Sequence, residues 1–325
     1  MKVLITGATG FVGSHLIEYC LTKANVKLYG TVFSYHSKDE LKNIESVKSK
    51  IKLLKCDLTN KNDVIRILKE VKPDKIFHLA AQSFVPVSWK DPQNTLFNNI
   101  VSELNIFEVL KGMKLDPVIQ IAGSSEEYGL VRKEEIPIKE SNLLRPLSPY
   151  AVSKITQDML ASQYHRSNNL KTVITRAFNH TGPRRDKRFV TSWFAYQIAS
   201  IEVGLQKPVI KVGNLDSYRD FSDVRDMVRA YWLATEKCKY GEPYNIGSGK
   251  TYQIKEVLSM LLSFSKSKIK IEKDPQLMRP SDVPILQCDC RKFKKATGWN
   301  PKINFETTLK DILNYWRKEI KLSIK

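Results

Sequence analysis

The sequence predicts an α/β protein built on a doubly wound parallel sheet, with a smaller C-terminal α/β region. Short apolar runs alternate with amphipathic segments through residues 1–180. That alternation is typical of parallel strands joined by covering helices. A glycine-rich turn lies between the first strand and the first helix. After Arg176 the alternation stops, which indicates that the chain leaves this sheet.

The apolar periodicity gives a set of elements in chain order. The expected strands are Lys2–Thr6, Val26–Phe33, Ile51–Leu54, Lys75–His78, Pro117–Ala122, Lys171–Arg176 and Val209–Val212. The expected helices are Ser14–Lys23, Asn60–Lys72, Thr95–Lys111, 149–160, Phe189–Glu202, Asp223–Lys237, Ile254–Ser263 and Phe305–Lys318. We expect residues 1–180, with return segments at about 221–250, to form the larger domain, and residues 181–325 to form mainly the smaller one.

Composition narrows the function classes. A chain of 325 residues with 42% hydrophobic and 27% charged residues is typical of a soluble globular protein. No run is apolar enough for a signal peptide or a membrane span, so we expect a cytoplasmic protein without a membrane partner. The net charge of +19 comes from lysines spread along the chain, which favours a basic surface over nucleic-acid binding. Five scattered cysteines predict reduced thiols and no metal site.

The first strand runs directly into Gly7-Ala8-Thr9-Gly10-Phe11-Val12-Gly13. The three glycines fall where the chain must turn tightly, where backbone must approach a pyrophosphate, and where the helix must pack on the sheet. The helix that follows offers free N–H groups to phosphates. This arrangement predicts a Rossmann-type, dinucleotide-binding sheet.

Other strand ends refine the cofactor. An acidic residue after the second strand would hold the ribose 2′-OH of NAD, but Ser34-Tyr-His-Ser-Lys38 stands there. NADP(H) is therefore favoured, and NAD(H) stays open. Asp57 could reach the adenine amino group, and the small residues Leu79-Ala80-Ala81 allow backbone to approach the cofactor.

A candidate proton-transfer pair follows Pro149, which suits the first turn of a helix. Tyr150 and Lys154 are four residues apart, so they share one helix face. An ammonium group near a phenol lowers the pKa of the phenol, and such a phenol could exchange a proton with a carbonyl or hydroxyl group. Taken alone, the spacing favours an ordinary surface pair, so the interpretation as a proton-transfer pair depends on the surrounding motifs.

Two further groups of polar residues are candidates. Ser124 and Glu126 follow the fifth strand; the serine could hydrogen-bond a substrate oxygen and the glutamate could act as a base, although both could be solvated loop residues. Arg219 and Arg279 lie in segments expected to be irregular, proline-bounded loops. Their planar donor groups suit the oxygens of a diphosphate.

Together these motifs resemble the extended short-chain dehydrogenase/reductase family, which acts on nucleotide sugars. The glycine turn, Leu79-Ala80-Ala81, Ser124, and Tyr150-x-x-x-Lys154 occur in that order and at fitting spacings. The resemblance covers essentially the whole chain. It implies that Tyr150 is the catalytic acid/base, that Lys154 binds the nicotinamide ribose, and that Ser124 polarises the reacting oxygen.

Finer motifs are similar to the GDP-mannose branch of this family. Ala80-Ala81-Gln82-Ser83, Phe178-Asn179-His180 and Pro183-Arg184-Arg185 resemble GDP-mannose 4,6-dehydratases. Gly123-Ser-Ser-Glu-Glu-Tyr-Gly129 and Arg279-Pro-Ser-Asp-Val-Pro284 are more similar to reductases of GDP-4-keto-6-deoxy-D-mannose, which make GDP-rhamnose. An epimerase is a second alternative.

The resemblance implies a homodimer, built from the helix after Thr95 and the Tyr150 helix, and it also implies three groups of site residues. The implied catalytic residues are Ser124, Ser125, Glu126, Tyr150 and Lys154. The implied cofactor contacts are Gly7, Thr9, Gly10, Phe11, Val12, Gly13, Asp57, Leu58, Leu79, Ala80, Ala81, Tyr150 and Lys154. The implied GDP-sugar contacts are Gln82, Ser83, Asn179, Arg185, Val190, Arg219 and Arg279. Because Glu126 occupies the position of the dehydratase base, it does not separate reduction from dehydration.

Overall fold

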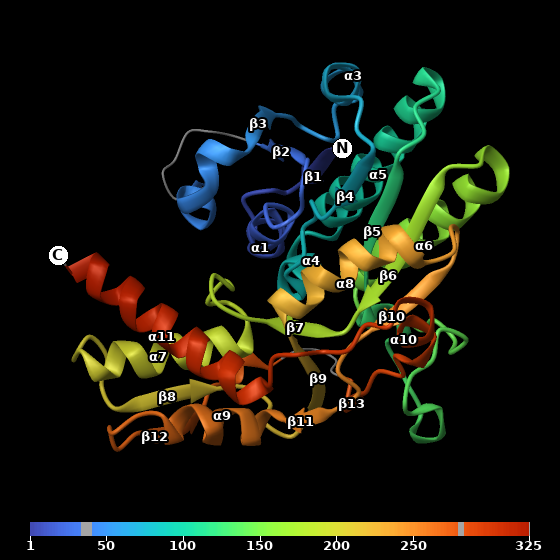
Figure 1. The fold of residues 1–325 in the computed structure, drawn as a ribbon. Coiled ribbons are helices and arrows are strands. Elements are labelled where there is room, and N and C mark those ends of the chain that lie inside the picture. Colours follow the sequence, from blue (N-terminus) through green and yellow to red (C-terminus); the bar gives the residue numbers. More distant parts are fainter. Residues whose placement is uncertain (34–40, 279–282, 325) are drawn as a thin grey trace.

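A computed structural model describes residues 1–33, 41–278 and 283–324. Its larger sheet has seven strands in the order β10-β6-β5-β4-β1-β2-β3, and every neighbouring pair is parallel (Figure 1). These strands are β1 (Lys2–Thr6), β2 (Lys27–Val32), β3 (Lys52–Lys55), β4 (Lys75–His78), β5 (Val118–Ser124), β6 (Lys171–Ala177) and β10 (Pro243–Ile246). The chain moves outward from β1 in one direction and then in the other, so the predicted doubly wound fold is confirmed.

Helices cover both faces of this sheet, as the amphipathic pattern requires. On one face lie α1 (Phe11–Cys20) and α8 (Val224–Lys237), whose apolar sides share a core that includes Leu16 and Trp232. On the other face lie α3 (Lys61–Val71), α5 (Pro92–Met113) and α6 (Pro149–Asn168), which bury Phe107 and Ala161. The short helix α4 (Val85–Lys90) leads into α5.

The start of α6 has clear local causes. Ser148 is the N-cap, and its side chain accepts a hydrogen bond from Ala151 N at 3.1 Å. Pro149 occupies the first helical position, where it needs no N–H partner. Asn169 ends the helix in the left-handed conformation, with φ of 59°. Tyr150 therefore lies in the first turn, close to the carboxyl ends of the strands.

The chain leaves the large sheet after β6 and forms two smaller sheets (Figure 1). One contains β7 (Asn179–Thr181), β9 (Tyr218–Asp223), β11 (Thr251–Gln253) and β13 (Ile285–Leu286), and the other pairs β8 (Val209–Val212) with β12 (Lys270–Lys273). Helices α7 (Val190–Glu202), α9 (Ile254–Ser263) and α11 (Phe305–Ile324) share a further core, and α10 (Arg291–Thr297) packs near β10.

Two expectations about local structure are wrong. Residues 218–223 form strand β9 and not an irregular loop, because three partner strands pair with this polar segment. Helix α1 begins at Phe11 and not at Ser14, because Gly10 already caps it. Among the described residues, all five cysteines are buried without disulfides, and no helix is long and apolar enough to cross a membrane.

Candidate active site

A cavity of about 610 Å³ follows the carboxyl ends of β1, β2, β4, β5 and β6, the place where open α/β sheets bind ligands. All predicted catalytic and cofactor-binding residues line it, together with four of the predicted substrate contacts: Gln82, Ser83, Asn179 and Arg185. Val190 and Arg219 do not line the cavity. Arg219 is buried within β9, where its Nη1 donates to Tyr218 O at 2.8 Å. Arg279 lies outside the described residues.

The glycine turn forms a cradle that side chains would fill. Gly7 has φ of +65°, and a Cβ atom there would lie 3.1 Å from the backbone of Ala80. A Cβ atom on Gly13 would lie 2.3 Å from Gly7 O. Gly10 is the N-cap residue of α1, and it has no side chain that could accept a hydrogen bond from the first turn. The N–H groups of that turn therefore stay available to a ligand in the cavity. These features fit the pyrophosphate of a dinucleotide cofactor.

Thr6, at the end of β1, fixes the segment that follows the neighbouring strand β4. Its Oγ1 accepts hydrogen bonds from Leu79 N and Ala80 N, each at 3.1 Å. Asp57, expected to meet the adenine, lines the cavity, and its Oδ1 accepts from Thr59 N and Thr59 Oγ1. Residues Ser34–Lys38, on which the preference for NADP(H) depends, lie outside the described residues.

Tyr150 is protonated at neutral pH. Its side chain is 8% exposed, and burial raises its pKa to about 12, although a hydrogen bond with Ser124 opposes that rise. The expectation that Lys154 lowers the pKa of Tyr150 is wrong for the polypeptide itself. Lys154 Nζ lies 6.0 Å from the centre of the Tyr150 ring. Desolvation in the cavity outweighs a charge held at that distance.

Lys154 points toward the base of the cavity. Its Nζ donates to Ala122 O and to Gln157 Oε1, each at 2.8 Å. An ammonium group has three donors, so one remains for a ligand in the cavity. Burial lowers the pKa of Lys154 to about 8, against the opposing charges of Glu103 and Glu127.

The segment after β5 is a short 3-10 helix, η2 (Ser125–Tyr128). Ser124 Oγ accepts from Glu126 N at 3.2 Å, and Glu127 Oε1 accepts from Ser124 N at 2.6 Å. Glu127 is fully buried, whereas Glu126 is only partly buried and lines the cavity. Two neighbouring glutamates thus have different tasks: one holds Ser124 in place, and the other faces the ligand space.

Aromatic rings hold Arg185 in the cavity wall. Its guanidinium carbon lies 3.4 Å from the centre of the Phe189 ring and 4.9 Å from that of Phe11. Burial lowers its pKa to about 10, so it remains charged at neutral pH. Close by, Asn179 Oδ1 is buried without a hydrogen-bond partner among the described residues. A charged donor fork and an unpaired acceptor are features of a polar ligand site.

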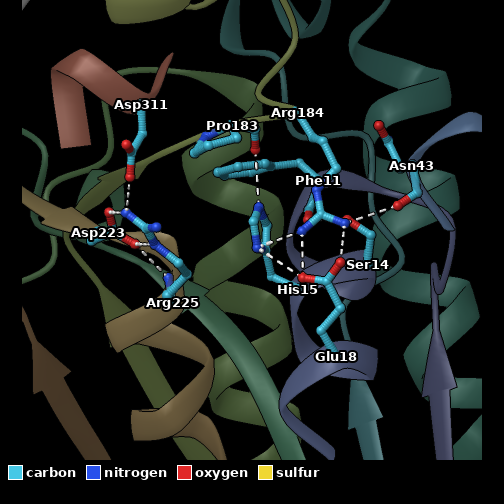
Figure 2. A network of polar contacts seen from close by, with 10 residues as sticks. All are labelled: Phe11, Ser14, His15, Glu18, Asn43, Pro183, Arg184, Asp223, Arg225 and Asp311. Carbon is cyan, nitrogen blue, oxygen red and sulfur yellow. Dashed lines mark hydrogen bonds and ion pairs between the residues drawn. The ribbon is translucent and has the colours of Figure 1, made fainter. Parts of the chain in front are cut away.

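Arg184, the residue before Arg185, is the centre of a polar network (Figure 2). It has φ of 71°, a strained value for a residue other than glycine. Its guanidinium group donates to both carboxylate oxygens of Glu18 at 2.8 and 2.7 Å, and to His15 Nδ1 at 2.7 Å. Since Nδ1 accepts, His15 donates through Nε2 to Pro183 O at 2.9 Å.

The same arginine is linked through Asn43 to the glycine turn. Arg184 Nη1 donates to Asn43 O at 2.9 Å (Figure 2). Asn43 Nδ2 in turn donates to Thr9 O at 3.0 Å. Asn43 belongs to η1 (Lys42–Lys50), and Thr9 lies in the glycine turn. The network therefore ties the loop that carries Arg185 to the phosphate-binding turn.

Several cavity residues were not identified from the sequence. Asn98 and Ser102 on α5 line the cavity, as do Phe189 and Tyr231. Asn98 and Ser102 are four residues apart and therefore share one face of the helix. That spacing is the only sequence signal that points to them. Nothing in the local sequence around Tyr231 distinguishes it from an ordinary core position.

Fold and site together define a nicotinamide-dependent enzyme of the short-chain dehydrogenase/reductase class. The parallel sheet, the glycine cradle, and the convergence of Ser124, Tyr150 and Lys154 on one cavity carry that assignment. A sequence model described as GDP-mannose 4,6 dehydratase matches residues 4–312. The chain therefore belongs to the GDP-mannose 4,6-dehydratase family.

Individual relatives include both reductases and dehydratases. A GDP-6-deoxy-D-mannose reductase from Pseudomonas aeruginosa is 30% identical, with 98% of each chain covered. A GDP-mannose 4,6-dehydratase from Yersinia enterocolitica is 32% identical, with 94% of this chain and 91% of the relative covered. Among solved structures, RMD from Pseudomonas aeruginosa complexed with NADPH has a TM-score of 0.84 and 30% identity, covering 98% of this chain and 99% of that one. A UDP-glucose 4-epimerase from Thermus thermophilus in complex with NAD has a TM-score of 0.86 and 28% identity, with 98% and 99% covered.

Proposed function

We propose that the protein reduces the C4 keto group of GDP-4-keto-6-deoxy-D-mannose with NADPH, giving GDP-D-rhamnose. Tyr150, buried in its protonated form next to Ser124, can supply the proton that C4 reduction needs. The same residue would also serve a dehydratase, so one observation on the relatives carries the choice of reduction. The alignment covers 98% of the reductase relative but only 84–92% of the dehydratase relatives.

Each catalytic residue has a task in this reaction. When bound, the reduced nicotinamide supplies the hydride that reaches C4. Ser124 hydrogen-bonds the keto oxygen and orients it, and Tyr150 transfers its phenolic proton to that oxygen as negative charge develops. The C4 carbonyl becomes a hydroxyl group, and Tyr150 is left as a phenolate. Lys154 in its ammonium form binds the nicotinamide ribose and stabilises that phenolate by its charge.

The GDP-sugar contacts follow from the cavity wall. Arg185 offers a charged donor fork, and the unpaired Asn179 Oδ1 offers an acceptor. Ser83 lines the same wall. Gln82 also lines it, but its amide already donates to Thr95 Oγ1 at 3.0 Å and accepts from Phe84 N at 2.7 Å. We therefore assign Gln82 a positioning role and assign ligand contact to the other three.

The preference for NADP(H) over NAD(H) is part of the proposal. It is supported by the missing acidic residue after the second strand and by the relative solved with NADPH. Parallel titrations of NADPH and NADH, followed by quenching of tryptophan fluorescence, test it. We expect NADPH to bind at least about tenfold more tightly; equal affinities would remove the preference.

Dehydration of GDP-mannose is the second candidate, and Glu126 is the observation that favours it. Its carboxylate lines the cavity near Tyr150, and a dehydratase needs such a base to remove the C5 proton. Glu126→Gln separates the two reactions, because it should stop dehydration and leave C4 reduction nearly unchanged. Loss of C4 reduction in Glu126→Gln would instead assign Glu126 a part in the reductase.

One pair of assays decides between the two reactions. The protein receives GDP-mannose without added NAD(P)H in one tube, and GDP-4-keto-6-deoxy-D-mannose with NADPH in the other. We expect NADPH oxidation and a reduced sugar only in the second tube. Formation of the keto sugar in the first tube would overturn the assignment as a reductase.

We also propose a homodimer formed through α5 and α6. Phe97 on α5 and Val152 and Met159 on α6 are large apolar side chains that are 42–53% exposed. Apolar side chains gathered on neighbouring helices are typical of association surfaces. Phe97→Lys combined with Met159→Lys should reduce the mass measured by light scattering to that of one chain. The control Leu322→Lys, at an exposed position on α11, should leave it unchanged, and an unchanged mass in the double variant would refute this interface.

A further inference from the structure

A buried cluster with more acids than bases lies behind Lys154. Three carboxyl groups, those of Glu103, Glu127 and Asp158, are at most 1% exposed, and two cations, Lys154 and Arg176, accompany them. Burying an unpaired charge is costly, so such a cluster must approach neutrality by holding a proton. The distribution of that proton decides the charge of Lys154.

Arg176 forms ion pairs with two of the three acids. Its Nε lies 2.7 Å from Asp158 Oδ2 and 3.3 Å from Glu127 Oε2. Glu127 also accepts from Ser124 N. Burial and the neighbouring Asp158 charge raise the pKa of Glu127 to about 8, so Glu127 holds a proton at neutral pH. Arg176, Glu127 and Asp158 then form a neutral group, which leaves Glu103 and Lys154.

Glu103 is poorly hydrogen-bonded. Neither of its buried carboxyl oxygens has a partner at full hydrogen-bond geometry among the described residues, although the Gln157 side chain lies close enough to lower its pKa by hydrogen bonding. A buried carboxyl group with so weak a partner costs stability. A hydrophobic residue would pack between two helices at lower cost, so a carboxyl group at this position calls for a role that uses its charge.

The packing of α5 on α6 directs Glu103 toward Lys154. Asn99 Nδ2 on α5 donates to Ser153 Oγ on α6 at 2.9 Å. One helical turn further, Glu103 follows Asn99 and Gln157 follows Ser153 on the same faces. Gln157 Oε1 accepts from Lys154 Nζ at 2.8 Å. Burial raises the pKa of Glu103 well above its ordinary value and lowers the pKa of Lys154. The charge of each group opposes the shift of the other, because a carboxylate and an ammonium group that are buried close together favour each other's charged form.

We propose that Glu103 is a positioning residue that supplies the counter-charge of Lys154 and keeps it in the ammonium form needed by the nicotinamide ribose. This inference rests on the proposed function, because it assumes that Lys154 binds the cofactor. Asp158 on α6 and Glu127 after β5 are the other titratable groups that act on the pair. Arg176 on β6 contacts both of these acids. His78 on β4 stays neutral because burial lowers its pKa to about 3.

The test follows NADPH binding by fluorescence from about pH 6 to about pH 10, a range that spans the Lys154 titration. In the wild type, affinity should fall as the pH rises and Lys154 loses its proton. Removing an opposite charge lowers the pKa of an ammonium group, so in Glu103→Gln the fall should begin about one pH unit lower. At pH values where the affinity of both proteins is falling, the NADPH dissociation constant of the variant is then about tenfold higher than that of the wild type.

Matched variants isolate the pair. Lys154→Met should bind NADPH weakly, and its affinity should not fall as the pH rises from about 6 to about 10. Adding Glu103→Gln to this variant should not change its NADPH affinity further. Glu108→Gln, on the same helix but paired with Lys111 and Tyr164 and not with Lys154, should follow the wild-type curve. If Glu103→Gln does not fold, Glu103→Asp replaces it, with a smaller shift in the same direction because its carboxylate is withdrawn from Lys154.

The outcomes separate the two proposals. Binding by the wild type, with a Glu103→Gln or Glu103→Asp curve that coincides with it, overturns the role of Glu103 and leaves the reductase assignment intact. Absence of NADPH and NADH binding by the wild type overturns the proposed function itself. A shift in Glu103→Gln that persists in the Lys154→Met background assigns the titration to another group and also overturns the inference.

Discussion

Replacing Arg184 by alanine and by glycine tests whether its network holds the cavity together. Both variants remove the same guanidinium contacts, to Glu18, His15 and Asn43. They differ in the backbone, because Arg184 has φ of 71°. Glycine adopts that conformation without strain, whereas alanine does not.

The structure sets the size of each effect. Without Arg184, His15 Nδ1 remains buried and unpaired, which costs about 1–3 kcal/mol. The Glu18 side chain is 40% exposed, so solvent screens that ion pair, and its loss adds less than about 1 kcal/mol. We therefore expect Arg184→Ala to lower the free energy of unfolding by about 2–3 kcal/mol. Relief of backbone strain, partly offset by chain entropy, should leave Arg184→Gly about 0.5–1 kcal/mol more stable than the alanine variant.

Urea unfolding followed by tryptophan fluorescence measures these differences. NADPH titrations of the same variants measure the effect on the cavity, because Asn43 connects Arg184 to Thr9 in the glycine turn. Loss of about 1 kcal/mol of ordering there corresponds to roughly fivefold weaker binding. Arg184→Lys, which keeps one charged donor, should fall between the wild type and Arg184→Ala.

Two results would refute this reasoning. If alanine and glycine at position 184 both leave the unfolding free energy within about 0.5 kcal/mol of the wild type, the network is an ordinary surface contact. If the variants unfold more easily but bind NADPH as tightly as the wild type, Arg184 stabilises the fold without organising the cofactor site.

Three further expectations concern catalysis, the glycine cradle and acid stability. Tyr150→Phe should lower kcat about 10²–10⁴-fold with the NADPH dissociation constant nearly unchanged, and stopped-flow NADPH oxidation that stays fast would move the acid role elsewhere. Gly13→Ala should abolish NADPH binding, because its Cβ would lie 2.3 Å from Gly7 O; Gly112→Ala, with nothing within 4 Å, is the matched control and should bind normally. His15 has its pKa lowered from 6.5 to about 4 by burial and by the Arg184 charge, so the unfolded chain takes up the proton first. The unfolding free energy should therefore fall by up to about 3 kcal/mol as the pH drops through that window, and a His15→Gln variant with the same slope would exclude His15 as the cause.

Much of the site could be predicted because its geometry is local. The glycine turn needs only its spacing and its place between a strand and a helix, and Tyr150 and Lys154 share a face through helical periodicity alone. Arg219 illustrates the opposite case. Its polar segment has the composition of a loop, and it becomes strand β9 only because β7, β11 and β13 pair with it.

The sequence by itself determined the parallel α/β architecture, the cofactor cradle, and the meeting of Ser124, Tyr150 and Lys154 at one cavity, whereas their catalytic roles are implied by the family resemblance. These features depend on periodicity and on the meeting of parallel strands at one edge, which are properties of short segments. Only the tertiary structure decided how these groups are charged. Burial raises the pKa of Tyr150 to about 12, and the packing of α5 on α6 places Glu103 where its charge raises the pKa of Lys154 against burial. Desolvation and charge pairing depend on what surrounds a group in space, and residues distant in the chain supply those surroundings.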